Sequence, residues 1–92
     1  MKDPLFPTGQ IVMTRGAIAT VNHAGVSPLV LLLRHVSGDW GDVHPEDAEA
    51  NVEALAEGAR LLSSYDLGPS GRLWIITEHD RSITTLLVPE EY

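Results

Sequence analysis

The sequence predicts an α+β fold in which about three N-terminal helices pack on one face of a C-terminal three-stranded antiparallel meander. Apolar residues recur at helical spacing before Gly58 and at alternate positions after it. Helices that precede a run of strands indicate α+β architecture rather than a parallel sheet. Since 92 residues are enough for one modest core, we expect residues 1–92 to form a single domain.

The chain begins with a segment of low helical content. We expect residues 1–9 to form an irregular N-terminal arm. The run "TGQIVMT" at 8–14, which overlaps the end of this arm, has high β-propensity. This run allows a short N-terminal strand to join the sheet.

Capping signals mark the first two helices. Thr14 is a suitable N-cap residue for a helix that Gly25 ends. Ser27 and Pro28 begin a second helix, which Gly38 ends in a left-handed turn. Because the stretch "LVLLLRHV" is apolar almost all round, we expect this second helix to be the buried one.

The third helix is predicted between Pro45 and Gly58, with Glu46 and Asp47 favouring its N-terminal dipole. At 100° per residue, one side is apolar and the opposite side is acidic. The apolar stripe consists of Ala48, Val52, Leu55 and Ala59. The acidic ridge consists of Glu46, Glu49, Glu53 and Glu57.

Three strands are predicted after Gly58, at 60–67, 72–78 and 82–88, joined by "GPSG" and "HDR". In the first strand, Leu61, Tyr65 and Leu67 alternate with Leu62, Ser64 and Asp66. This alternation predicts one face toward the helices and one toward water.

Charge is concentrated in one part of the chain. The formal net charge is −7, and residues 39–57 contain acidic residues but no Lys or Arg. Such a field repels phosphate backbones and attracts basic proteins, so we expect a basic protein partner and no direct nucleic-acid binding. The apolar run "PLVLLL" is too short to span a bilayer, and the absence of Cys suits a reducing compartment. We therefore expect a cytoplasmic protein.

The acidic junction at 34–51 has two interpretations. Its side chains include potential oxygen and imidazole ligands, namely Asp39, Asp42, His44, Glu46 and Asp47. Their spacing matches no calcium or zinc motif, so we predict no metal and expect Asp42 or His44 to cap the third helix. Trp40 is either a plug in the core or an exposed interface anchor.

A second polar group, at 77–85, resembles the parts of a phosphodiester-cleaving site. His79 and Arg81 lie at a predicted hairpin tip, and Thr84 follows on the outgoing strand. His35 completes the set if its helix ends over the sheet, with His as acid or base and Arg as anion stabiliser. The alternative is a solvated turn. No phosphate loop or dinucleotide fingerprint is present, and we expect no cofactor.

Four segments, "LFPTGQIV", "RHVSGDWGD", "LLSSY" and "WIITEHDRSITTLLVPEEY", resemble the plasmid-related proteins, a family of small proteins of bacterial plasmids and integrative elements. The resemblance covers nearly the whole chain. It implies a mobile-element context and interference with a host process, and it transfers no catalytic residue.

Two functional hypotheses follow. The preferred one is a non-enzymatic accessory protein that binds a host or element-encoded protein through Trp40 and the acidic ridge. The alternative is a small endoribonuclease of barnase-like or RelE-like architecture that uses His35, His79, Arg81 and Thr84.

Overall fold

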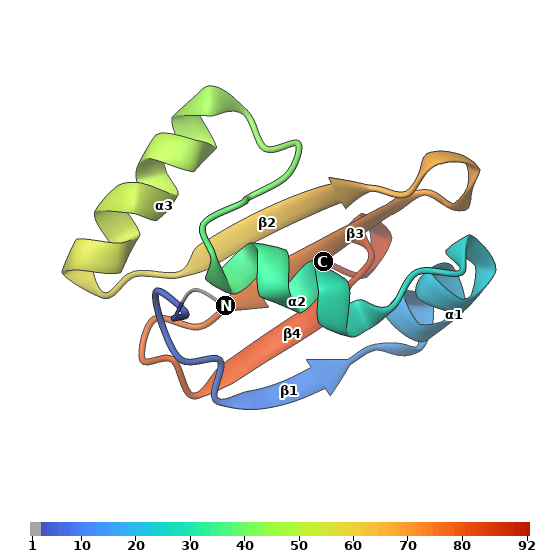
Figure 1. The fold of residues 1–92 in the computed structure, drawn as a ribbon, viewed down its shortest axis with the longest axis horizontal. Coiled ribbons are helices and arrows are strands. Elements are labelled where there is room, and N and C mark those ends of the chain that lie inside the picture. The colour runs from blue at the N-terminus through green and yellow to red at the C-terminus, as the bar shows by residue number, and fades with distance from the viewer. Residues whose placement is uncertain (1–2) are drawn as a thin grey trace.

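Three helices and a four-stranded mixed sheet form the computed structural model, which describes residues 3–92 (Figure 1). The α+β class is therefore confirmed. The elements in chain order are β1 (Gln10–Met13), α1 (Arg15–Ala24), α2 (Pro28–Val36), α3 (Pro45–Glu57), β2 (Leu61–Asp66), η1 (Gly68–Ser70), β3 (Arg72–Thr77), β4 (Ile83–Leu87) and η2 (Pro89–Glu91). Both η elements are single 3₁₀ turns.

The predicted meander is present, and a fourth strand extends it. β2 pairs with β3 and β3 with β4, both antiparallel. β1 then pairs parallel with β4, so the sheet order is β1-β4-β3-β2. The sheet is mixed because β1 is parallel to its neighbour, whereas the other two strand pairs are antiparallel. All three helices lie between β1 and β2 in the chain. Residues 3–9 contain no helix or strand, although Phe6 of this arm is buried.

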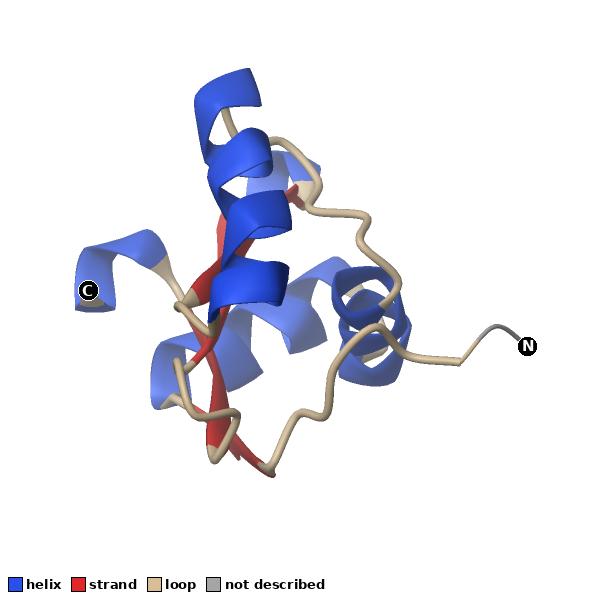
Figure 2. Ribbon diagram, turned by 90° about the vertical axis from the view of Figure 1, so that its left-hand side faces the viewer, coloured by secondary structure: helices blue, strands red, loops and turns tan. Residues whose placement is uncertain are grey.

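The helices do not all lie on one face, which corrects the predicted arrangement. α1 and α2 cover one face, whereas α3 runs along the outer edge of β2 (Figures 1 and 2). The amide of Asn51 donates to the carbonyl of Leu62 at 2.7 Å and accepts from its N–H at 3.0 Å. A side-chain amide on α3 thus satisfies strand groups that another strand would otherwise pair with.

The contact face of α3 also differs from the predicted stripe. Asn51 and Ala54 are its buried residues, whereas Val52 is 61% exposed and Ala59 is exposed. Ala48 and Leu55 of the predicted stripe do pack against the core. The prediction fails at Val52 and Ala59 because α3 meets a strand edge and turns Asn51 toward it. A hydrophobic pattern does not mark that residue.

α2 is buried on one side only, which corrects the expectation of a helix buried all round. Leu31, Leu32, His35 and Val36 face the core. Leu29, Val30 and Leu33 are 62%, 52% and 41% exposed. Helices form a single layer over this face of the sheet, so among residues 3–92 no other helix or strand covers the outer side of α2 (Figure 2).

Two apolar clusters hold these layers together. One lies between α1, α2 and the sheet and includes Leu31, Tyr65 and Leu86. The other lies beneath the end of α2 and contains Phe6, Val36, Trp40, Ala54 and Leu61. The first cluster joins α1 and α2 to the sheet, and the second joins α3 and the N-terminal arm to it.

α1 begins with a double cap. The hydroxyl of Thr14 accepts from the N–H of Ala17 at 3.1 Å, as predicted, and donates to the carboxylate of Glu91 at 2.5 Å. Glu91 also accepts from the N–H of Gly16, so the C-terminal turn η2 is bound to the start of α1.

Within residues 3–92, no single helix is long and apolar enough to cross a membrane. α1 and α2 pass that test only as a pair, with a bend of 106° between them.

Candidate functional site

A buried chain of hydrogen bonds connects two of the residues assigned to the endoribonuclease hypothesis. His35 lies between the hydroxyls of Ser63, at 2.6 Å from Nδ1, and Thr77, at 2.9 Å from Nε2. Thr77 is 2.8 Å from the hydroxyl of Thr84, which donates to the carbonyl of Thr8 at 2.7 Å. β2, β3, β4 and the N-terminal arm thus all contribute to the polar centre of the core.

The donor and acceptor of each hydrogen bond in this series follow from the number of protons that each side chain carries. Thr84 uses its one proton on Thr8, so Thr77 donates to Thr84 and accepts from Nε2–H of His35. The unprotonated Nδ1 then accepts from Ser63. Burial, together with the nearby charge of Arg81, lowers the pKa of His35 to about 4. A neutral imidazole therefore completes this network at neutral pH.

Arg81 performs a structural task at the β3–β4 turn. Its guanidinium donates to the carbonyls of Ala54 and Ala59 at the end of α3, and to that of Glu78 within the turn. The residue itself adopts a left-handed conformation, with φ of 60°. Arg81 thereby joins the hairpin to α3, and its donors face protein carbonyls.

These positions do not form an exposed reaction site. His35 and Thr84 are both 0% exposed. His79 is exposed at the turn, and its side chain forms no hydrogen bond within residues 3–92. The structure therefore brings His35 and Thr84 together in the core and leaves His79 outside, so a substrate has no access to the combined set.

The junction between α2 and α3 is stabilised by contacts other than the predicted caps. Asp39 pairs with Arg34 at 2.7 Å and accepts from the N–H of Gly41. Asp42 accepts from the N–H of Asp66 rather than from α3. His44 occupies the N-cap position without a side-chain cap bond. Among residues 3–92, no three His, Asp or Glu side chains gather as metal ligands.

Trp40 lies in the core, and this corrects its place in the predicted binding surface. It is 8% exposed and stacks with Phe6 at 6.3 Å between ring centroids, while His35 meets it edge-on at 5.8 Å. The plug interpretation therefore holds for Trp40.

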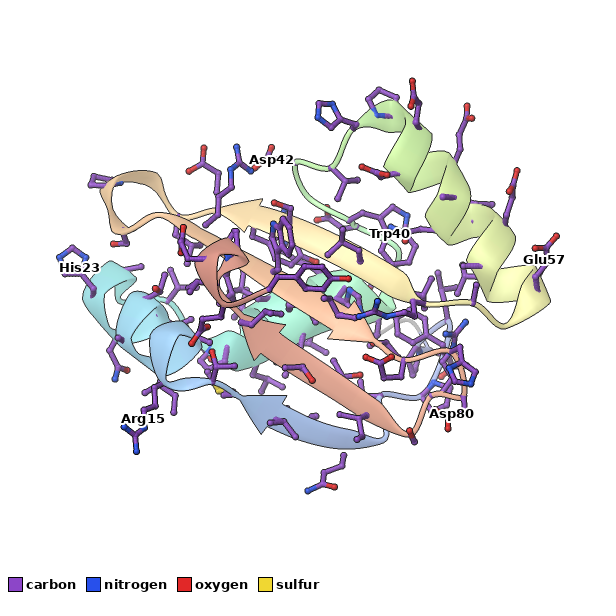
Figure 3. The ribbon with its side chains drawn as sticks, turned by 180° about the vertical axis from the view of Figure 1, so that it is seen from behind. Arg15, His23, Trp40, Asp42, Glu57 and Asp80 are labelled. Atoms are coloured by element: carbon purple, nitrogen blue, oxygen red, sulfur yellow. The ribbon has the colours of Figure 1, made fainter. Side chains whose placement is uncertain are left out.

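The acidic ridge is exposed as predicted. Glu46, Glu49, Glu53 and Glu57 are all solvent-facing, and Glu57 points away from the sheet at the end of α3 (Figure 3). The ion pairs found in residues 3–92 join Arg34 to Asp39, Arg60 to Glu78 and Arg72 to Asp42. None of them neutralises a ridge carboxylate.

An apolar shoulder, formed by Val52, adjoins the ridge, and a separate hollow lies at the start of α3; sequence reasoning missed both. Val52 stands beside Glu49 and Glu53 on the outer side of α3. At the start of α3, the residues that line a hollow of about 340 Å³ include Leu62, Trp74, Asp47 and Arg72. Trp74 was expected only as a strand residue, since nothing in its local pattern places it beside α3.

Comparison of the chain with protein-family models, curated proteins and solved structures finds no match.

Proposed function

We propose that this chain is a small non-enzymatic accessory protein of a mobile element that binds a host or element-encoded protein with a basic surface through α3. The observation that carries the proposal is the exposed acidic ridge, whose four carboxylates have no basic partner within residues 3–92. Elsewhere in the acidic segment, Asp39 and Asp42 are already paired with arginines. Five acids without a basic partner, the four ridge residues and Asp47, thus lie on a single helix.

The apolar shoulder gives the ridge the composition of a recognition surface. Interfaces combine apolar anchors with charged rims, and charge complementarity sets orientation and association rate. Val52 offers the apolar contact beside Glu49 and Glu53, and the hollow with Trp74 offers a second one at the start of the helix. A basic segment with apolar side chains at helical spacing matches this surface.

The test compares two double variants that change charge equally. Glu49→Gln with Glu53→Gln alters the ridge, and Asp3→Asn with Glu90→Gln alters exposed acids away from α3; each moves the formal charge from −7 to −5. A partner is first isolated from host lysate with the wild type, and its binding kinetics are then measured. We expect the ridge variant alone to lose at least about tenfold in affinity, mainly through a slower on-rate.

Salt supplies a second readout. Exposed charges are screened over about 8 Å at physiological ionic strength, so wild-type association should weaken as salt rises while the ridge variant responds less. Thermal unfolding of both variants should match the wild type, because exposed charges contribute only fractions of a kcal/mol. Equal partner binding by the two variants at low salt would refute the ridge as the binding surface.

A further inference from the structure

The two edges of the sheet differ in whether their outward backbone groups are hydrogen-bonded. On β2, the outward N–H and C=O of Leu62 are bonded to Asn51, and those of Ser64 to the backbone of Trp40 and Asp42. The N–H of Asp66 donates to the Asp42 carboxylate. Leu62 and Ser64 therefore have no free outward backbone groups, and the outward N–H of Asp66 is also bonded.

The opposite edge, at β1, is open. Gln10 and Thr14 donate inward to the carbonyls of Ser82 and Leu86. Because backbone groups alternate along a strand, Ile11 and Met13 direct theirs outward. Among the described residues, no other segment pairs with them there, and Figure 1 shows β1 as the outermost strand. β1 contains no Pro and no charged residue, the devices that normally protect an edge.

Exposed apolar side chains continue from this edge onto α2. The guanidinium of Arg34 lies 4.5 Å from the ring centroid of Tyr65, so that flank of α2 faces β2. Helical geometry puts Leu29 and Leu33 on the other flank, toward β1. Ile11 pairs with Thr84, whose side chain is buried beneath the helices, and Ile11 therefore stands on the same face as α2.

The charge distribution permits two copies to meet here. Residues 4–38 contain no Asp or Glu, although the whole chain carries −7. The acidic ridge lies beyond β2, at the far side of the β1-β4-β3-β2 sheet. Contact between two copies at β1 thus keeps their acidic ridges as far apart as the sheet allows.

We propose that two copies of this chain associate through β1 and the exposed flank of α2. A twofold axis at Val12 pairs the β1 strands antiparallel, so that Ile11 of one copy exchanges backbone hydrogen bonds with Met13 of the other. The two sheets become one continuous sheet. Leu29 and Leu33 of each copy then add apolar area that a four-residue strand cannot supply alone, since stable interfaces bury about 800 Å² per partner.

The experiment measures molecular mass across a wide protein concentration range by sedimentation and light scattering. We expect the wild type to show a monomer–dimer equilibrium. Ile11→Lys and Leu33→Lys each add a charge to the interface and should raise the dimer dissociation constant at least about tenfold. Val52→Lys is the matched control, because Val52 is an exposed apolar residue on α3, beyond the opposite edge.

Both test positions are partly exposed in the single chain, Ile11 at 49% and Leu33 at 41%, so folding should survive either change. Far-ultraviolet circular dichroism and thermal unfolding check this. A wild type that remains monomeric at millimolar concentration overturns the proposal, and binding of that monomer to neutral lipid vesicles would assign the patch to a lipid surface. Equal weakening by Val52→Lys would also overturn it.

Discussion

His35 shows how one buried residue makes stability depend on pH. Its neutral ring is held by Ser63 and Thr77, and burial followed by the Arg81 charge lowers its pKa from 6.5 to about 4. The unfolded chain binds this proton more readily than the folded one. The contribution of His35 is therefore complete above pH 6.5 and is lost as pH falls toward 4.

We predict that the free energy of unfolding falls by about 3 kcal/mol between pH 7 and pH 4 from this residue alone, at about 1.4 kcal/mol per pKa unit. Denaturant unfolding at several pH values measures the decline. Most of it should occur above pH 4.5. Asp39 and Glu91, whose carboxyl pKa values are lowered in the folded chain, add further loss of stability as the pH falls below the pKa values of their unfolded forms. His35→Gln, which cannot titrate, should show a much flatter profile; an unchanged profile would contradict this account.

Arg81 offers a second prediction at the residue scale. Arg81→Ala removes donors from three backbone carbonyls, two of them at the end of α3. We expect a loss of about 1–3 kcal/mol in the free energy of unfolding, measured by chemical denaturation. Arg15, which points into solvent from α1 (Figure 3), provides the control, and Arg15→Ala should change stability little. Equal losses of unfolding free energy in Arg81→Ala and Arg15→Ala would contradict a structural role for Arg81.

At the scale of elements, the decisive feature is how α3 attaches to the sheet. Asn51 substitutes for a neighbouring strand by bonding both backbone groups of Leu62. This contact leaves the ridge and Val52 facing outward, whereas packing on the sheet face would have covered Val52. The exposure of the acidic surface is thus a consequence of an edge contact.

Asn51→Leu should therefore be destabilising although it adds apolar area. It leaves the N–H and C=O of Leu62 without partners in a partly buried position, at a cost of about 1–3 kcal/mol. Hydrogen exchange should report the effect locally, with faster exchange of the Leu62 amide. Val52→Leu changes a neighbouring exposed residue and should leave that amide protected. Unchanged exchange in Asn51→Leu would show that the bond is dispensable.

At the scale of the whole molecule, the two proposed surfaces lie at opposite ends of the sheet. α3 borders β2, and β1 forms the other edge. A ridge variant and a β1 variant therefore act on surfaces that share no residue, and their effects on partner binding and on dimer formation can be measured independently. The endoribonuclease hypothesis has no such surface, because two of its four residues are inside the core.

The local pattern of the sequence determined the elements of this protein. Helix ends at Thr14, Pro28, Pro45 and Gly58, the three meander strands and the exposed ridge all follow from capping residues and periodicity, which act over a few neighbouring positions. Those signals do not depend on where the element is placed in the fold.

Only the tertiary structure decided the neighbours of each element. Whether Trp40 is buried, which side of α2 is covered and where α3 attaches depend on contacts between residues far apart in the chain. Asn51 bonds to Leu62, and His35 reaches Ser63 and Thr77 on two different strands. A local pattern records the chemistry of a side chain, but its partner is chosen by the packing of the whole chain, because burial and hydrogen bonding must be satisfied together.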